Sequence, residues 1–105
     1  MGIETPRITT QTLSILSVFL TRPDEEIAGA DVARKTGLKS GTLYPALFRL
    51  ERAKWLQSKW EDGVPAELGR PRRRMYLLTP KGEEQARSVC VKVSEMIGGV
   101  AWQKA

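Results

Sequence analysis

The sequence contains no histidine and a single cysteine, Cys90. Histidine is the side chain that most often acts as a general acid or base near neutral pH, and it is a common metal ligand. One cysteine can form neither an intrachain disulfide nor a zinc site of several thiolates. Since there is also no glycine-rich phosphate-binding fingerprint, we expect a protein that is not an enzyme and holds no metal or cofactor. We interpret Cys90 as a small buried hydrophobic residue.

Long hydrophobic runs are also missing. No segment approaches the roughly 20 apolar residues that a membrane-spanning helix requires. Residues 1–7 lack the charged-then-apolar pattern of a signal peptide. These absences predict a cytoplasmic protein without membrane contact, and 105 residues are enough for one domain.

Positive charge is concentrated in the middle of the chain. The net charge is +5, but residues 34–74 contain eleven Lys and Arg against four Asp and Glu, a net of +7, so the remaining residues together carry −2. Such a concentration is typical of a surface that binds a polyanion. A solvated basic face without a partner is the alternative.

Two helices are predicted in the first third of the chain. A helix over residues 9–20 would have Thr9 or Thr10 as its cap, and a short helix over residues 30–36 would end at Gly37. The first helix has apolar residues on more than one stripe, so more than one of its sides should be buried.

A third helix follows a tight turn. Ser40 or Thr42 would cap it, Pro45 would lie near its first turn, and it would end near residues 53–54. A single apolar stripe should face the core, formed by Leu43, Leu47 and Leu50.

A β-hairpin is predicted next. Strands over residues 56–61 and 74–78 alternate polar and apolar residues, and the loop between them is rich in Gly, Pro and Arg, giving a long basic tip. One or two residues of the connector 24–28 could pair with this hairpin. The outer face of the hairpin carries two apolar residues, Met75 and Leu77. We expect a helix or a partner to cover them.

The last helix is predicted from Pro80 to at least residue 98, with Thr79 as its cap. Its apolar residues follow the alternating three- and four-residue spacing of a coiled-coil seam. The seam could fold back on its own domain or pack on a second subunit, and the apolar excess of the first helix favours the second arrangement. The predicted dimer interface consists of Leu13, Leu16, Val89, Val93, Met96, Ile97 and Val100.

The order helix, helix, turn, helix, strand, basic loop, strand, helix is that of a winged helix-turn-helix. The predicted fold class is therefore mainly α with a small β-hairpin. Residues 1–79 would form the winged helix-turn-helix DNA-binding domain, and residues 80–105 the C-terminal dimerisation helix.

Small polar and cationic side chains begin the third helix, which enters the major groove in such a domain. Hydroxyl groups can bond phosphates or base edges, and arginine fits phosphate oxygens. The alternative is that Ser40 and Thr42 only cap the helix, Tyr44 only packs, and the loop arginines are merely solvated. The predicted DNA-binding residues are Lys39, Ser40, Thr42, Tyr44, Arg49, Arg70, Arg72 and Arg73.

Four motifs carry a family resemblance. The chain closely resembles the PadR family of transcriptional regulators at residues 40–47 (SGTLYPAL), 49–51 (RLE), 69–72 (GRPR) and 76–82 (YLLTPKG). The resemblance implies a winged-helix homodimer, usually a repressor, that dimerises through its C-terminal helix. It also implies that Lys39, Ser40, Thr42 and Tyr44 contact DNA from the recognition helix, and Arg70, Arg72 and Arg73 from the wing.

The sequence departs from the family pattern at two places. Lys54 stands where the family commonly has glycine, and a left-handed backbone there would cost about 1 kcal/mol. Residues 26–29 replace the usual aromatic-glycine stretch. The single short C-terminal helix corresponds to the small subgroup of the family.

The predicted function is sequence-specific binding of double-stranded DNA by a homodimeric transcriptional regulator, a repressor acting on a palindromic operator. Members of the family often release DNA when a phenolic or drug-like effector binds. Trp102 could line a pocket for a small aromatic ligand at the dimer interface, or it could simply pack. A winged-helix protein-interaction module without sequence-specific DNA binding is the alternative.

Overall fold

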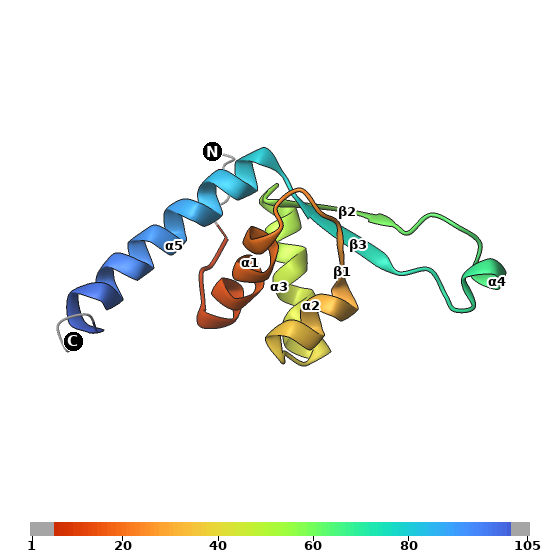
Figure 1. Cartoon of the computed structure of the whole chain (residues 1–105), viewed down its shortest axis with the longest axis horizontal. Coiled ribbons are helices and arrows are strands. Elements are labelled where there is room, and N and C mark those ends of the chain that lie inside the picture. The colour runs from red at the N-terminus through yellow and green to blue at the C-terminus, as the bar shows by residue number, and fades with distance from the viewer. Residues whose placement is uncertain (1–5, 102–105) are drawn as a thin grey trace.

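The computed structural model describes residues 6–101, with side chains up to residue 98. A central body of helices and a small sheet has two extensions in opposite directions, a β-ribbon on one side and the last helix on the other (Figure 1). The elements are α1 (Thr10–Thr21), β1 (Ile27–Ala28), α2 (Gly29–Thr36), α3 (Ser40–Arg52), β2 (Leu56–Trp60), α4 (Pro65–Leu68), β3 (Arg74–Leu78) and α5 (Pro80–Ala101).

The boundaries of α1 and α2 follow from local signals that the sequence displays. The Thr9 hydroxyl accepts a hydrogen bond from the Thr12 N–H at 3.1 Å and caps α1. Gly37 has a φ of 75° and ends α2, and its N–H donates to the Ala33 carbonyl at 2.8 Å. Both predicted helices are thereby confirmed.

The start of α3 differs from the prediction. Lys39 is the N-cap residue, and its carbonyl accepts from the N–H groups of Thr42 and Leu43, so neither Ser40 nor Thr42 caps the helix. Pro45 is consequently the sixth helical residue rather than a first-turn residue. Proline has no N–H, so Pro45 cannot donate the helical hydrogen bond that the Gly41 carbonyl would normally accept. Because both residues are exposed, water can bind this carbonyl in place of the missing donor.

The sheet has three antiparallel strands in the order β1-β3-β2. Leu56 lies opposite Leu78 and Trp60 opposite Arg74, which confirms the predicted hairpin, and the two-residue β1 pairs with the other edge of β3. The outer-face residues Met75 and Leu77 are half-buried and line an open cavity of about 330 Å³. The covering of this face by a partner stays a prediction.

The core lies between the sheet and the helices α1, α2 and α3. Leu16, predicted at the dimer interface, is completely buried in this core and has no surface left for a second subunit. The reason is that α1 packs against α2, α3 and α5 of its own chain and contributes Leu16 to the core cluster that they share. The largest completely buried side chains include Ile15, Leu16, Phe19, Leu43 and Leu47.

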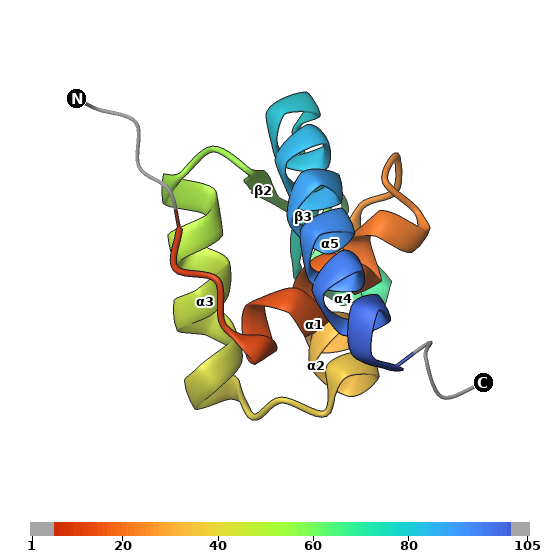
Figure 2. The same ribbon diagram turned by 90° about the vertical axis from the view of Figure 1, so that its left-hand side faces the viewer.

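The first turn of α5 is fixed against the segment that follows α3. Thr79 donates its N–H to the Trp55 carbonyl at 3.0 Å, and its hydroxyl accepts from the Gly82 N–H at 2.9 Å, which confirms Thr79 as the cap. Gly82 lies so close to Trp55 that a Cβ there would overlap the Trp55 carbonyl group. Ala86 is completely buried and Val89 still packs against the core, and beyond Val89 α5 leaves the body (Figures 1 and 2).

Lys54 adopts the left-handed conformation that the family's usual glycine allows, with a φ of 70°. Its Cβ makes this conformation unfavourable, so the Lys54→Gly variant is expected to raise the free energy of unfolding by about 1 kcal/mol. Chemical denaturation measures the change. A matched Lys35→Gly variant, in the exposed last turn of α2, should lower stability by a similar amount. Equal losses in both variants would contradict the strain at Lys54.

Candidate nucleic-acid interface

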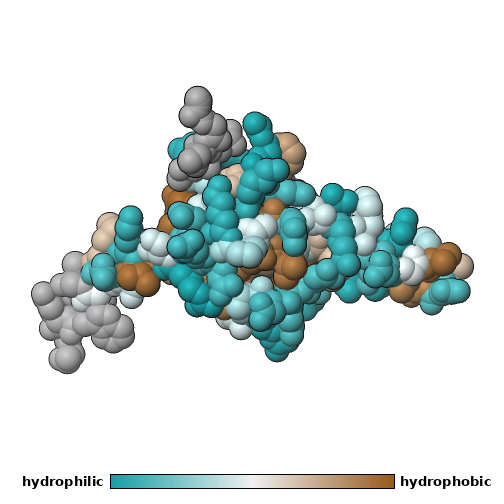
Figure 3. Space-filling view, turned by 90° about the horizontal axis from the view of Figure 1, so that it is seen from above, coloured by the Kyte–Doolittle hydropathy of each residue, from teal (hydrophilic) through white to brown (hydrophobic). Residues whose placement is uncertain are grey.

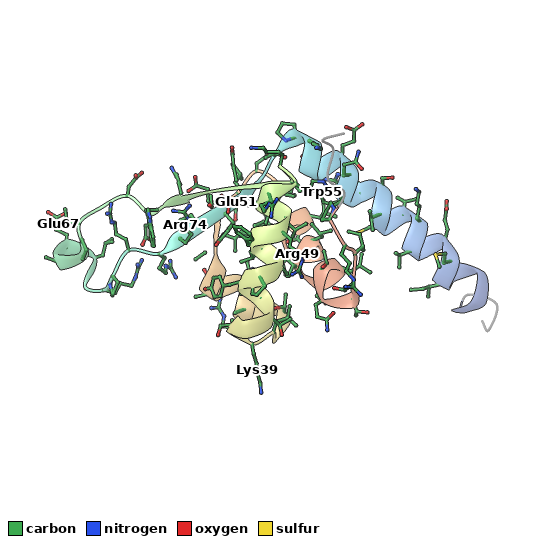
Figure 4. The ribbon with its side chains drawn as sticks, turned by 180° about the vertical axis from the view of Figure 1, so that it is seen from behind. Lys39, Arg49, Glu51, Trp55, Glu67 and Arg74 are labelled. Atoms are coloured by element: carbon green, nitrogen blue, oxygen red, sulfur yellow. The ribbon has the colours of Figure 1, made fainter. Side chains whose placement is uncertain are left out.

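The face of α3 opposite the core presents polar and cationic side chains to solvent. In Figure 4, α3 lies at the front, Lys39 projects from its lower end and Arg49 lies along its length. Lys39, Ser40, Thr42 and Arg49 are all exposed. This arrangement follows from the helical period, since Leu43, Ala46, Leu47 and Leu50 occupy the buried side.

The hydroxyls of Ser40 and Thr42 have no hydrogen-bond partner among the described residues, and neither residue caps α3. They are therefore available to an external partner. Tyr44 has an intermediate position. Its ring approaches Gly29 at the start of α2, where an added Cβ would lie 2.9 Å from the ring, yet 41% of the residue is exposed. Tyr44 therefore packs on Gly29 and remains partly accessible to solvent.

Two of the predicted wing arginines are already held by carboxylates. The wing comprises β2, α4, β3 and their connections, residues 56–78. Arg70 donates to both oxygens of Glu61, at 2.6 and 2.9 Å, and Glu61 also accepts the Arg73 N–H at 3.2 Å. The Arg73 guanidinium lies 3.8 Å from Asp31 and 3.9 Å from Glu61. We call this cluster of Glu61, Arg70, Arg73 and Asp31 the arginine clasp.

Arg72 differs from its neighbours, because it is exposed and no ion pair is found for it within residues 6–101. Arg70, Arg72 and Arg73 are all predicted to bind DNA, whereas the structure separates Arg72 from the two arginines of the clasp. Arg72 is therefore the wing arginine best placed to meet a phosphate.

Hydrogen bonding to Arg70 lowers the pKa of Glu61 from 4.5 to about 2, with the Arg73 N–H adding to the effect. The carboxylate therefore stabilises the wing fully above pH 4.5, and this contribution is lost as the pH falls through about 2. NMR titration of the Glu61 carboxyl carbon should show a midpoint near pH 2. The Arg70→Gln variant should move that midpoint towards the ordinary value. An ordinary midpoint in the parent protein would mean that the clasp does not persist in solution.

A second network joins the wing to α3. Ser58 donates to the Glu51 carboxylate at 2.6 Å, and Arg74 Nε donates to the Ser58 hydroxyl at 3.1 Å. The Arg74 guanidinium also lies over the Trp60 ring, 5.1 Å from its centre. Sequence reasoning missed these residues, although the pairing of Trp60 with Arg74 follows once the strand register is known.

The far end of the wing, residues 62–69, contains no basic residue, contrary to the predicted basic tip. It contains the short helix α4 and the acidic residues Asp62 and Glu67, while the arginines lie on the returning segment (Figure 4). Val64 is 53% exposed, and hydrophobic residues gather at this end of the molecule (Figure 3). The wing tip is therefore apolar and acidic.

The part of α5 that leaves the body exposes apolar side chains. Met96 is 74% exposed and Ile97 57% exposed, and Val93 is half-buried. Val89 packs against the core and Leu13 is half-buried. The Val100 side chain and Trp102 lie outside the described part of the chain.

The described residues offer neither a metal site nor a membrane-spanning helix. No group of three or more His, Cys, Asp or Glu side chains there could hold a metal ion. None of the helices in that part of the chain combines the length and apolar character needed to cross a membrane.

Several solved structures share this architecture. A PadR family transcriptional regulator from Eggerthella lenta is 22% identical, with a TM-score of 0.68 over 89% of this chain and 83% of its own. MepR, a transcription regulator of the Staphylococcus aureus multidrug efflux pump MepA, is 22% identical, with a TM-score of 0.69 over 91% of this chain. PcaV, a transcriptional regulator from Streptomyces coelicolor solved with its natural ligand, is 20% identical, with a TM-score of 0.71 over 91% of this chain.

The chain spans 65% of the length of MepR and 62% of that of PcaV. No curated protein matches it. The model of the PadR-like family of transcriptional regulators matches residues 30–88, which include α2, α3, the wing and the first turns of α5. The fold of these regulators is the winged helix, and none of the three is an enzyme. The chain belongs to the PadR-like family of transcriptional regulators.

Proposed function

We propose that the protein binds double-stranded DNA sequence-specifically as a homodimer and represses transcription from a palindromic operator. The observation that carries this proposal is the exposed face of α3, where unpaired hydroxyls of Ser40 and Thr42 lie between the cations Lys39 and Arg49. Such a face provides both phosphate contacts and base-edge contacts in the major groove. Arg72 of the wing would reach the adjacent phosphates.

The homodimer rests on the exposed apolar part of α5. A second copy packed on Val93, Met96 and Ile97 would remove this surface from water and pair two copies of α3 about a twofold axis. Two recognition helices related in this way read two half-sites one helical turn apart, which is the geometry of a palindrome.

We further propose that a small aromatic ligand regulates DNA binding. The support is the structure of PcaV in complex with its natural ligand and the presence of Trp102 near the end of α5. Titration of tryptophan fluorescence with phenolic compounds tests this point. A bound compound that leaves DNA affinity unchanged would contradict it.

Selection of bound sequences from a random DNA pool is the direct test of sequence-specific binding. The proposal predicts enrichment of an inverted repeat. The apolar and acidic wing tip is the observation that favours the competing function, docking to another protein. Recovery of DNA without any shared sequence would favour that second function over the first.

Arg72 offers a test of the wing. If Arg72 neutralises one phosphate in each subunit, the Arg72→Gln variant should have a weaker salt dependence of DNA binding. The slope of the logarithm of the association constant against the logarithm of the salt concentration should become shallower by about 0.9 per subunit, and affinity should fall similarly on all sequences. The matched control is Arg87→Gln, which removes an exposed arginine of α5 that is paired with Glu83. Equal slopes for the parent and the Arg72 variant would exclude Arg72 as a phosphate contact.

A further inference from the structure

The outward face of α3 carries a nonpolar strip in its centre. Gly41, Pro45 and Phe48 follow one another at intervals of four and three residues, directly opposite the buried stripe of the same helix. Phe48 is 59% exposed, and the Arg52 guanidinium carbon lies 5.9 Å from the centre of its ring. The core does not use this ring, because four other residues of α3 occupy the buried side.

The surroundings of Phe48 indicate what could cover it. Lys39 at the N-terminal end of α3 and Arg49 next to Phe48 are exposed and carry positive charge, and the free hydroxyl of Thr42 lies on the flank of the strip. A hydrophobic protein partner would have to desolvate these groups. A nucleic acid instead pairs them with phosphates and base edges, and it also offers one apolar group in the major groove, the C5-methyl group of thymine.

We propose that Phe48 contacts the C5-methyl group of a thymine and is a specificity-determining residue of this protein. This inference rests on the proposed binding of DNA through α3. Contact of a phenyl ring with that methyl group buries apolar surface of both partners, and it distinguishes an A·T pair in one orientation from the other three base-pair arrangements.

The position of the thymine follows from the helix. Phe48 lies six residues after Thr42, a rise of about 9 Å along an α-helix. The rise of roughly 3.4 Å per base pair is measured along the duplex axis, and the path of the groove is longer. The thymine should therefore lie about two to three base pairs from the base or phosphate that Thr42 contacts.

Single replacement of each thymine in the selected DNA by deoxyuridine tests the inference, because uracil pairs identically but lacks the methyl group. The parent protein should lose about fourfold in affinity at one thymine of each half-site, as expected for one methyl-sized apolar group. The Phe48→Ala variant loses the contact in both subunits, so it should bind the thymine DNA about sixteenfold more weakly and no longer distinguish it from the uracil DNA. Phe48→Leu, which keeps an apolar side chain, should retain part of the discrimination.

The control is Val91→Ala, which truncates a residue of α5 with 55% exposure and should keep the full preference for thymine. Two results would overturn the role of Phe48 while leaving the proposed function intact. In the first, the parent binds specifically but loses no affinity when any thymine methyl group is removed. In the second, the Phe48→Ala variant still discriminates fully between thymine and uracil. The absence of any sequence preference in the parent would overturn both.

Discussion

Replacing Gly82 with alanine is expected to destabilise the protein by about 3 kcal/mol, the upper end of the cost of overpacking. Helix propensity alone predicts the opposite sign, because alanine is the better helix former by about 1 kcal/mol. The added Cβ would overlap the Trp55 carbonyl group, which is backbone and cannot rotate away. The first turn of α5 would have to move, breaking the hydrogen bonds of Thr79 to Lys54 and Trp55.

Urea denaturation of this variant and of a matched Gly41→Ala variant provides the measurement. Gly41 lies in α3 with no atom within 4 Å of an added Cβ, so alanine should raise stability there by about 1 kcal/mol. If Gly82→Ala were as stabilising as Gly41→Ala, the close packing of α5 on Trp55 would be wrong.

The second large effect is expected from the exposed part of α5. Introducing two carboxylates by Met96→Glu and Ile97→Glu should dissociate the proposed dimer, since charges cannot be buried there without partners. Loss of the second recognition helix should weaken binding to a two-half-site operator by roughly a hundredfold, the lower range of the gain from bivalent attachment. Analytical ultracentrifugation and gel-shift titration measure the two effects.

The Val91→Glu variant is the control, because it places a carboxylate about a third of a turn around α5 from the tested residues, at a position that is also exposed. It should remain a dimer with unchanged DNA affinity. A double variant that still sediments as a dimer would show that the subunits associate through another surface.

The sequence predicts the elements of this fold well because their ends depend on local chemistry. Thr9, Gly37 and Thr79 each satisfy backbone groups of their own turn, so these caps can be recognised without tertiary information. Pro45 shows the limit of the same reasoning. A proline is expected in the first turn of a helix, but exposure of the Gly41 carbonyl allows it farther inside.

Tertiary arrangement accounts for the features that sequence patterns do not predict. Leu16 has the hydrophobicity of an interface residue, and only the packing of α1 against α2, α3 and α5 shows that it belongs to the core. Arg70 and Arg72 are indistinguishable as sequence signals. Their different environments depend on Glu61, which the fold of the wing brings within 2.6 Å of Arg70.

Hydroxyl-radical footprinting of the protein on its selected DNA tests the central claim most directly. Two copies of α3 in a twofold dimer should protect two segments whose centres are about 10 base pairs apart, with further protection on the outer side of each from the wing. A single protected segment, or protection that does not depend on the DNA sequence, would contradict a dimer that reads DNA through α3.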